Sequence, residues 1–232
     1  MMRFHRLRSA VLPFALTATL HAQHPDTTGW EELFAANLSN AQLVIPASAA
    51  ISAADSWTFE NGELVAKNPL TLWTRESYGD FILDLEFKTT KQANSGVFLR
   101  SGDIGNVLKA LEIQVHENQD GHLYGMVGAL YNACPPSKDM ARPVGEWNRY
   151  TITCKGPKIT VVFNGETVVD ADLDRWTEPL KNPDGTANKF AVALKDFSRK
   201  GPIGLQGLHG PGRVFSEMAP VHYRNLKIKR LD

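Results

Sequence analysis

The chain is poor in cysteine. Only Cys134 and Cys154 occur among its 232 residues. Structural zinc sites usually take four ligands in close-spaced pairs, so two distant cysteines do not indicate one. Their spacing leaves two interpretations open, a disulfide formed in an oxidising compartment or two buried thiols.

Excess charge is also absent. Lysine and arginine together number 25, and aspartate and glutamate together also number 25. Nucleic acids and anionic membranes attract proteins through basic surfaces, which such a balance does not favour. The composition therefore predicts a neutral ligand and no nucleic-acid partner.

A long apolar segment is missing after the first residues. The run from Ala10 to Leu20 is too short to span a bilayer, which takes about 20 apolar residues. Three arginines precede this run and the small Ala22 follows it. That layout is typical of a secretory signal peptide, and it predicts a periplasmic or secreted protein without a membrane span. The expected organisation is a signal peptide (1–22), a polar linker (23–28) and one domain (29–232).

The domain lacks any helical period over about 11 or more residues. Instead, short alternating segments such as FILDLEFKT (81–89) are separated by turns. Asn61-Gly62 and Asn164-Gly165 supply the positive φ that two-residue hairpins need. This rhythm predicts an all-β sandwich of antiparallel sheets. Two loops rich in Pro, Asp, Asn and Gly, 133–146 and 173–190, are where we expect binding residues.

The segment ALEIQVHENQ (110–119) contains an unusual polar row. Glu112, Gln114 and His116 stand at every second position, with aliphatic residues between them. Because strand side chains alternate between faces, the aliphatic residues enter a core and the polar row lies on the opposite surface. That surface is either an ordinary solvated face or the floor of a binding groove.

Several further blocks occur together in a recognisable order. They are SYGDFILDLEFKTTKQANSGVFLRSG, LEIQVHE, VGALYNACPP, GEWNRYTITCKGPKITVVFNGE, GPIGLQGLHG and HYRNLKIKRL. In these blocks, from Trp30 to Leu231, the chain resembles the 3-keto-disaccharide hydrolase family. The resemblance implies a concanavalin A-like jelly roll, two curved antiparallel sheets with a sugar site on the concave face. It also implies an exported enzyme that cleaves 3-keto-glycosides supplied by a separate sugar 3-oxidoreductase. One departure is LQGLHG in place of LQDHG, which inserts a residue before His209.

With the resemblance included, the polar row is expected to form the floor of a sugar groove. Convergent Arg, Glu, Gln and His side chains are what a sugar pocket needs. Asn94 could instead belong to a tight turn, and Tyr131 could lie in the core with its hydroxyl satisfied. Trp147 is expected in the core. The expected catalytic residues are Glu112, His209 and His116, and the expected substrate-binding residues are Arg100, Gln114, Gln206, Asn94 and Tyr131.

The residue types fit elimination from a 3-keto sugar better than the double displacement of a conventional glycosidase. A conventional retaining glycosidase needs two carboxyl groups about 5 to 5.5 Å apart, whereas Glu117 would lie on the opposite face from Glu112. In a 3-keto sugar the ketone acidifies the hydrogen on carbon 2, so one base can remove it while the glycosidic oxygen leaves carbon 1. Glu112 or His209 would transfer protons, and Arg100 would face the developing oxyanion. Glu112, His116 and His209 could also hold a divalent metal ion.

Three functions fit the sequence. The first is cleavage of 3-keto-glycosides by elimination and hydration. The second is a carbohydrate-binding module without chemistry, and the third is a conventional β-glycan hydrolase. A shared fold does not decide between them.

Overall fold

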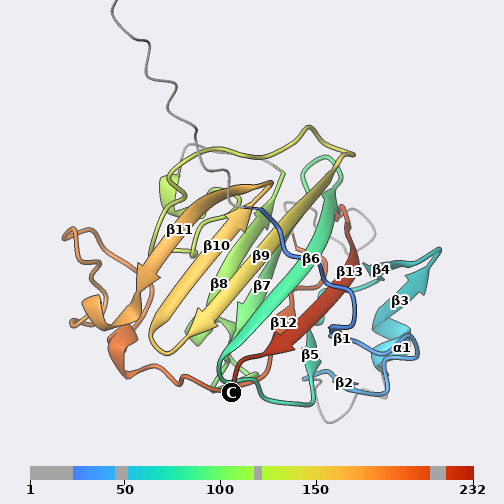
Figure 1. The fold of residues 1–232 in the computed structure, drawn as a ribbon, viewed down its shortest axis with the longest axis horizontal. Helices are drawn as coiled ribbons and strands as arrows, with labels where there is room; N and C mark the ends of the chain where they lie inside the picture. The colour runs from blue at the N-terminus through green and yellow to red at the C-terminus, as the bar shows by residue number, and fades with distance from the viewer. Residues whose placement is uncertain (1–22, 45–51, 118–121, 210–217) are drawn as a thin grey trace, which may run out of the picture.

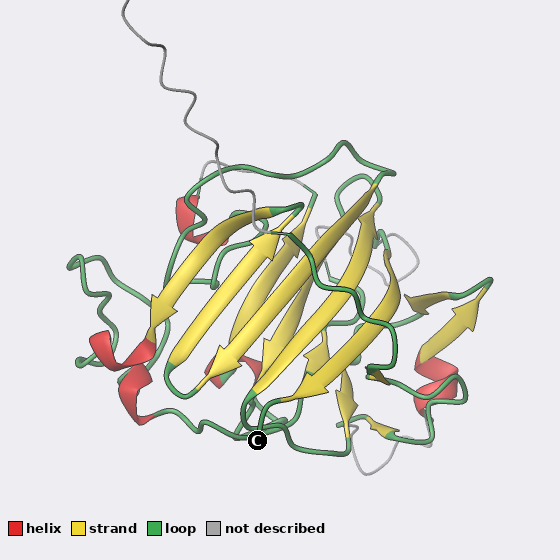
Figure 2. Cartoon of the chain, viewed as in Figure 1, coloured by secondary structure: helices red, strands yellow, loops and turns green. Residues whose placement is uncertain are grey.

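The structure is a computed structural model that describes residues 23–44, 52–117, 122–209 and 218–232. The predicted signal peptide, 1–22, lies outside the described residues. Within them, strands dominate and the helices are a turn or so long (Figure 2). No helix in this part of the chain has both the length and the apolar character needed to cross a membrane.

The larger sheet has eight antiparallel strands in the described part of the chain. Its order is β11-β10-β9-β6-β13-β4-β3, and β1 pairs with β13 beside this path (Figure 1). Its strands are β1 (Glu31–Glu32), β3 (Trp57–Glu60), β4 (Glu63–Ala66), β6 (Phe81–Thr89), β9 (Trp147–Lys155), β10 (Lys158–Phe163), β11 (Glu166–Asp172) and β13 (Val221–Arg230).

The smaller sheet has five described strands in the order β2-β5-β12-β7-β8, again antiparallel. They are β2 (Ala41–Gln42), β5 (Leu72–Thr74), β7 (Asn94–Leu99), β8 (Leu111–His116) and β12 (Gly204–Leu205). The helices are α1 (Ala53–Ser56) and four short 3-10 helices at Val107–Lys109, Leu123–Gly125, Leu173–Arg175 and Leu194–Asp196. The expected all-β sandwich is confirmed.

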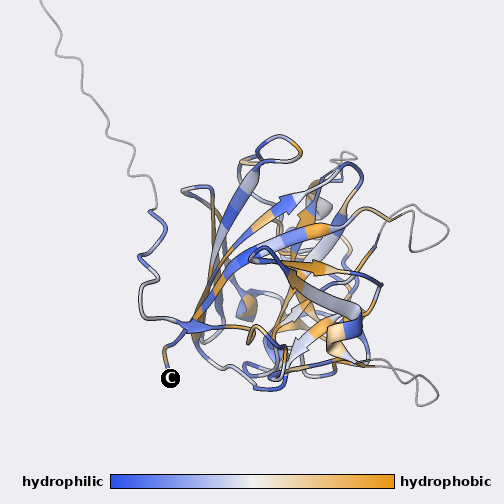
Figure 3. Cartoon of the chain, turned by 90° about the vertical axis from the view of Figure 1, so that its right-hand side faces the viewer, coloured by the Kyte–Doolittle hydropathy of each residue, from blue (hydrophilic) through white to orange (hydrophobic). Residues whose placement is uncertain are grey.

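The core lies between the sheets because each strand turns alternate side chains toward it. On β6 the residues Phe81, Leu83, Leu85 and Phe87 are fully or almost fully buried, and Ile113 on β8 is buried with them in one cluster. Apolar stretches, orange in Figure 3, accordingly gather inside the sandwich. The alternation of apolar and polar residues therefore determines which face of each sheet packs in the core and which face lies outside and can bind a ligand.

Both Asn-Gly turns behave as expected. Asn61 and Gly62 join β3 to β4 with φ of 53° and 81°, and Asn164 and Gly165 join β10 to β11. The cysteine question is resolved in favour of thiols, because Cys134 and Cys154 are both free and Cys154 is buried in the core.

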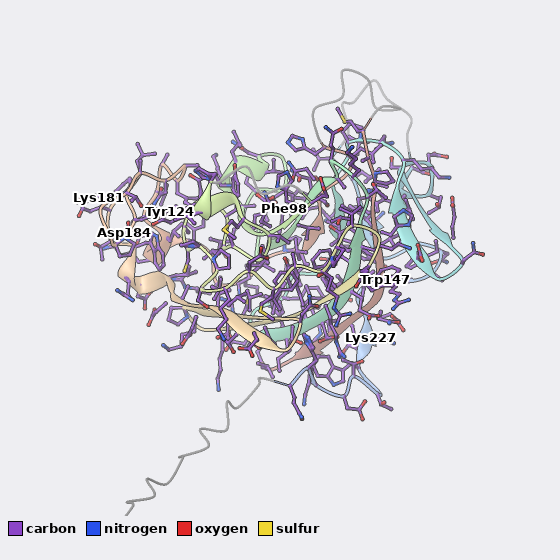
Figure 4. The ribbon with its side chains drawn as sticks, turned by 90° about the horizontal axis from the view of Figure 1, so that it is seen from above. Phe98, Tyr124, Trp147, Lys181, Asp184 and Lys227 are labelled. Atoms are coloured by element: carbon purple, nitrogen blue, oxygen red, sulfur yellow. The ribbon has the colours of Figure 1, made fainter. Side chains whose placement is uncertain are left out.

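Trp147 does not lie in the core, which corrects the expectation for it. It pairs with Lys88 on the face of β6 that points away from the core. There the Arg224 guanidinium lies 3.9 Å and the Lys88 ammonium 4.6 Å from its ring centroid. Figure 4 shows Trp147 and Lys227 on the same side of the molecule. Tyr150, three positions further along β9, points into the core instead.

The segment that follows the predicted signal peptide crosses the outer face of the larger sheet. Gly165 N–H donates to His24 Nε2 (3.0 Å), so His24 Nδ1 carries the proton and donates to Thr151 Oγ1 (2.8 Å). Thr151 in turn donates to Asp84 (2.5 Å), which also accepts from Arg149 (2.9 Å). Both ring nitrogens of a neutral His24 are thus used. Burial and the nearby Arg149 charge lower the pKa of His24 from 6.5 to about 4.

His24 should make stability depend on pH. Its pKa is lower in the folded chain than in the unfolded chain, so folding favours the neutral ring. Its contribution is complete above pH 6.5 and should be lost progressively as the pH falls from 6.5 through about 4. Thermal unfolding of the wild type and of His24→Gln tests this, because the difference in Tm should shrink across that window. A difference that stays constant with pH would contradict the assignment.

Candidate active site

The outer face of the smaller sheet carries the polar row in a regular grid. Cross-strand partners share a face, and Glu112 pairs with Phe98 while Gln114 pairs with Gly96. Phe98 continues to Gly204 and then to Trp73 on the next strands. The row of β8 therefore lies on one face together with an aromatic pair, since Trp73 and Phe98 stack with centroids 5.4 Å apart.

Glu112 occupies space that a glycine provides. A methyl group built at Gly96 would lie 2.8 Å from Glu112 Cδ and closer still to Oε1. Glu112 is only 6% exposed, because its side chain lies across β7 and is covered from above. Burial raises the pKa of Glu112, and the neighbouring Lys189 opposes that rise. The result is a carboxyl group held in one place with its proton affinity increased.

Lys189 is the partner that covers Glu112. Its Nζ lies 3.6 Å from Glu112 Oε2 and 4.8 Å from the ring centroid of Tyr131. Burial lowers the pKa of Lys189, while Glu112 opposes the change. Both members of the pair are therefore shifted toward their neutral forms, as at sites that transfer protons.

The loop that carries Lys189 is fixed by hydrogen bonds on both sides of it. Phe190 N–H donates to Asn188 Oδ1 (2.9 Å), and Asn188 Nδ2 donates to Asn182 Oδ1 (3.0 Å). Asn182 also accepts from Trp176 Nε1 (2.8 Å). At the tip of the same loop Asp184 accepts from Tyr124, and Figure 4 shows these two residues side by side. A lysine on this loop can thus be directed at one carboxylate.

Lys189 is the site residue that sequence reasoning missed. It falls in the loop 173–190 that was expected to carry binding residues, but a lysine between Asn188 and Phe190 reads as a solvated charge. The signal that could have found it is the unpaired Glu112 at a buried strand position, because a buried carboxylate requires a cation nearby.

On the same face, a line of residues that runs across the strands holds both expected histidines. Asn94 pairs with His116 on one side and with His209 on the other. The register between β12 and β7 moves by one residue before His209, so the extra residue of LQGLHG forms a bulge and His209 still lies opposite Asn94. Asn94 Oδ1 is buried without a hydrogen-bond partner among the described residues. Such an atom can accept a hydrogen bond from a ligand hydroxyl.

The two glutamines lie between this line of residues and Glu112. Gln206 N–H donates to the Gly96 carbonyl (2.9 Å), which places Gln206 beside the strand position that faces Gln114. Gln114 is buried, and its Oε1 accepts from Val115 N–H (3.1 Å). Tyr131 donates its backbone N–H to the Glu112 carbonyl (2.8 Å) and is partly exposed beside Lys189, outside the core cluster.

Arg100 is not on this face, so its expected placement is wrong. Its φ of 47° ends the alternation of β7 and turns the side chain inward, where it is fully buried. The guanidinium donates to the carbonyls of Gly79 and Gly156 (both 2.7 Å) and to Asp80 (2.9 Å). Arg100 therefore ties the end of β7 to turns of the larger sheet, and the cation near the polar row is Lys189.

The metal hypothesis does not fit the geometry. Glu112, His116 and His209 all lie in the described part of the chain. Among the residues described there, no three His, Cys, Asp or Glu side chains are grouped closely enough to hold a metal ion. We therefore derive no step through a metal.

Comparison with known proteins shows the family. Residues 24–229 match the family described as a 3-keto-alpha-glucoside-1,2-lyase-like domain. The chain belongs to this family. A 3-keto-disaccharide hydrolase from Bacteroides thetaiotaomicron is 27% identical over 177 residues, which cover 67% of this chain. The match spans 60% of the length of that relative.

Solved structures agree with this membership. A candidate glycosyl hydrolase from Parabacteroides distasonis has a TM-score of 0.76 at 33% identity, covering 87% of this chain and 99% of that one. A second candidate glycosyl hydrolase from the same organism has a TM-score of 0.64 at 19% identity, covering 84% and 90%, and shows the fold alone.

Gly96→Ala should displace Glu112. Because the new methyl group would occupy the position of the carboxyl group, the pair with Lys189 should open. Turnover of a 3-keto-glycoside, the activity proposed below, should then fall at least 10-fold. Steady-state kinetics of single and double variants test the cause. Added to Glu112→Gln, the same change should cost little further activity, because the two act on one group. Independent, additive losses would contradict this account.

Proposed function

We propose that this protein cleaves 3-keto-glycosides, with Glu112 and Lys189 as the reacting pair. The observation that carries the proposal is the buried Glu112 carboxylate with the half-buried Lys189 ammonium 3.6 Å away, on a sheet face that also presents Asn94, His116 and His209. Family membership and the activity named for the Bacteroides thetaiotaomicron relative support a 3-keto sugar as substrate.

The pair can perform the elimination. The Glu112 carboxylate takes the proton from carbon 2, and the Lys189 ammonium stabilises the charge that develops on the ketone oxygen at carbon 3. The electron pair then forms the double bond between carbons 1 and 2 and expels the glycosidic oxygen, which takes a proton from His209 or His116. Water then adds to carbon 1 and gives one proton back to that histidine, while the proton on Glu112 returns to carbon 2. The net reaction is hydrolysis to a 3-keto sugar and an alcohol.

This route requires one carboxylate rather than two. Glu117 accepts a hydrogen bond from Gln92 N–H (2.8 Å), so it supports a turn near the end of β8. The double displacement of a conventional glycosidase is therefore less well supported. A binding module without chemistry would have no need of a buried carboxylate paired with a half-buried lysine, because desolvating charges costs free energy that binding alone does not require.

The substrate has to be made by oxidation. A ketone at carbon 3 arises from a sugar hydroxyl only through loss of a hydride, so a sugar 3-oxidoreductase is the proposed functional partner. The proposal places both steps outside the cytoplasm, because the first 22 residues have the layout of a signal peptide.

Removing the Glu112 carboxylate should abolish most activity. Glu112→Gln keeps the shape of the side chain but cannot accept the proton, so turnover of a 3-keto-disaccharide should fall by roughly 10²-fold or more. Glu117→Gln is the matched control and should stay within a few-fold of the wild type. Sugar release is followed with the oxidised substrate and with its unoxidised parent, with and without a chelator. Cleavage of the parent, or full activity of Glu112→Gln, would refute the proposal.

Export is tested by the N-terminus of the mature protein. Protein recovered from the periplasm or the culture medium should begin near Gln23, because cleavage is expected near Ala22. N-terminal sequencing or intact mass measures this directly. Recovered material that retains residues 1–22 would contradict export through a cleaved signal.

A further inference from the structure

A cavity of about 420 Å³ adjoins the reacting pair. It lies between the loop 102–109, the start of β8 and the segment 189–198. Lys189 belongs to its lining and also pairs with Glu112 at 3.6 Å, so this one side chain contacts both the cavity and the carboxylate. Five large apolar side chains also line it: Leu108, Leu111, Phe190, Val192 and Phe197. The other charged residues of the lining are Arg100, Asp103 and Lys109.

Two aliphatic side chains at this cavity are unusually exposed. Leu108 is 68% and Val192 51% accessible to solvent. Phe190 and Phe197 meet edge to face, with centroids 5.4 Å apart at 87°. Exposed aliphatic groups around an aromatic pair favour an apolar ligand, because covering them removes apolar surface from water.

The polar side chains of the cavity already have partners. Arg100 bonds to Gly79, Gly156 and Asp80, and Lys189 pairs with Glu112. Asp103 accepts from Gly105 N–H (3.0 Å) and pairs with Lys109 at 3.5 Å. Asn106 Oδ1 accepts from Leu108 N–H (3.2 Å), where it caps the short 3-10 helix. A second sugar ring needs several hydrogen-bond partners for its hydroxyl groups when it is buried. The cavity is therefore poorly matched to a sugar.

We propose that this cavity is the aglycone subsite and that it accepts an aromatic or similarly flat apolar group. The inference rests on the proposed function. It assigns the sugar ring to the polar side chains around Glu112 and Asn94 on the outer face of the smaller sheet. A cavity of about 150 Å³ suffices for benzene, so 420 Å³ has room for a group of two fused rings. The preferred substrate is then the 3-keto-glycoside of a phenol, with the phenol oxygen as the leaving group at carbon 1.

The experiment compares two substrates that share the oxidised sugar. One carries a naphthyl aglycone and the other a second glucose, and kcat/KM is measured for each with the wild type, Val192→Asp and Val144→Asp. Val144 is 46% exposed and outside the cavity lining, so its variant controls for a new surface charge. The wild type should prefer the naphthyl substrate by roughly 10-fold or more, the size of effect that one apolar group has in a pocket. Val192→Asp should remove this preference, and Val144→Asp should keep it.

Binding measured without turnover separates this inference from the proposed function. Calorimetry with Glu112→Gln should show tighter binding of the naphthyl substrate than of the disaccharide, and adding Val192→Asp should abolish the difference. That result supports the subsite even where the wild type cleaves neither substrate, in which case only the proposed chemistry fails. Equal binding of the two substrates, or a preference that survives Val192→Asp, would overturn the subsite.

Discussion

The arrangement of the site depends on the alternation of β8. Leu111, Ile113 and Val115 enter the core between the sheets, and this fixes Glu112 on the opposite face. A carboxyl group fixed there and covered needs a cation, because an isolated buried charge costs several kcal/mol. Lys189 meets that need. The glycine opposite Gln114 meets a second need, since Glu112 can lie flat only where the neighbouring strand has no side chain.

Two buried carboxylates, Asp84 and Glu112, differ in how firmly their partners hold them. Asp84, on the outer face of the larger sheet, is held by Arg149 at 2.9 Å and Thr151 at 2.5 Å and is covered by the segment around His24. Glu112 has its cation at 3.6 Å, longer than a good hydrogen bond. Asp84 is thus satisfied by fixed partners and stabilises the docked segment. Glu112 instead pairs with the long, flexible side chain of Lys189, which a substrate could displace.

The features that sequence could predict are those with a short-range cause. Alternation identified the core face of β6 and the polar row of β8, and the Asn-Gly pairs identified two hairpins. What failed depended on backbone geometry or on long-range packing. By the alternation of β7 the Arg100 side chain would lie on the outer face, but the positive φ of Arg100 itself turns that side chain inward. Lys189 is 77 positions from Glu112, and only the packing of the loop 173–190 brings them together.

The pKa values of Glu112 and Lys189 are shifted in opposite directions, and this affects how the two side chains could exchange protons with a substrate. Burial raises the pKa of Glu112 and lowers that of Lys189, while each partner opposes the change in the other. The charged and neutral forms of the pair therefore lie closer in free energy than they would in water. A base must accept a proton and later return it, which is easiest when neither form is strongly favoured. A ketone oxygen that becomes negative beside Lys189 would favour the ammonium at the moment when Glu112 gains its proton. The same two side chains can then serve both elimination and hydration, without a second carboxylate on the face.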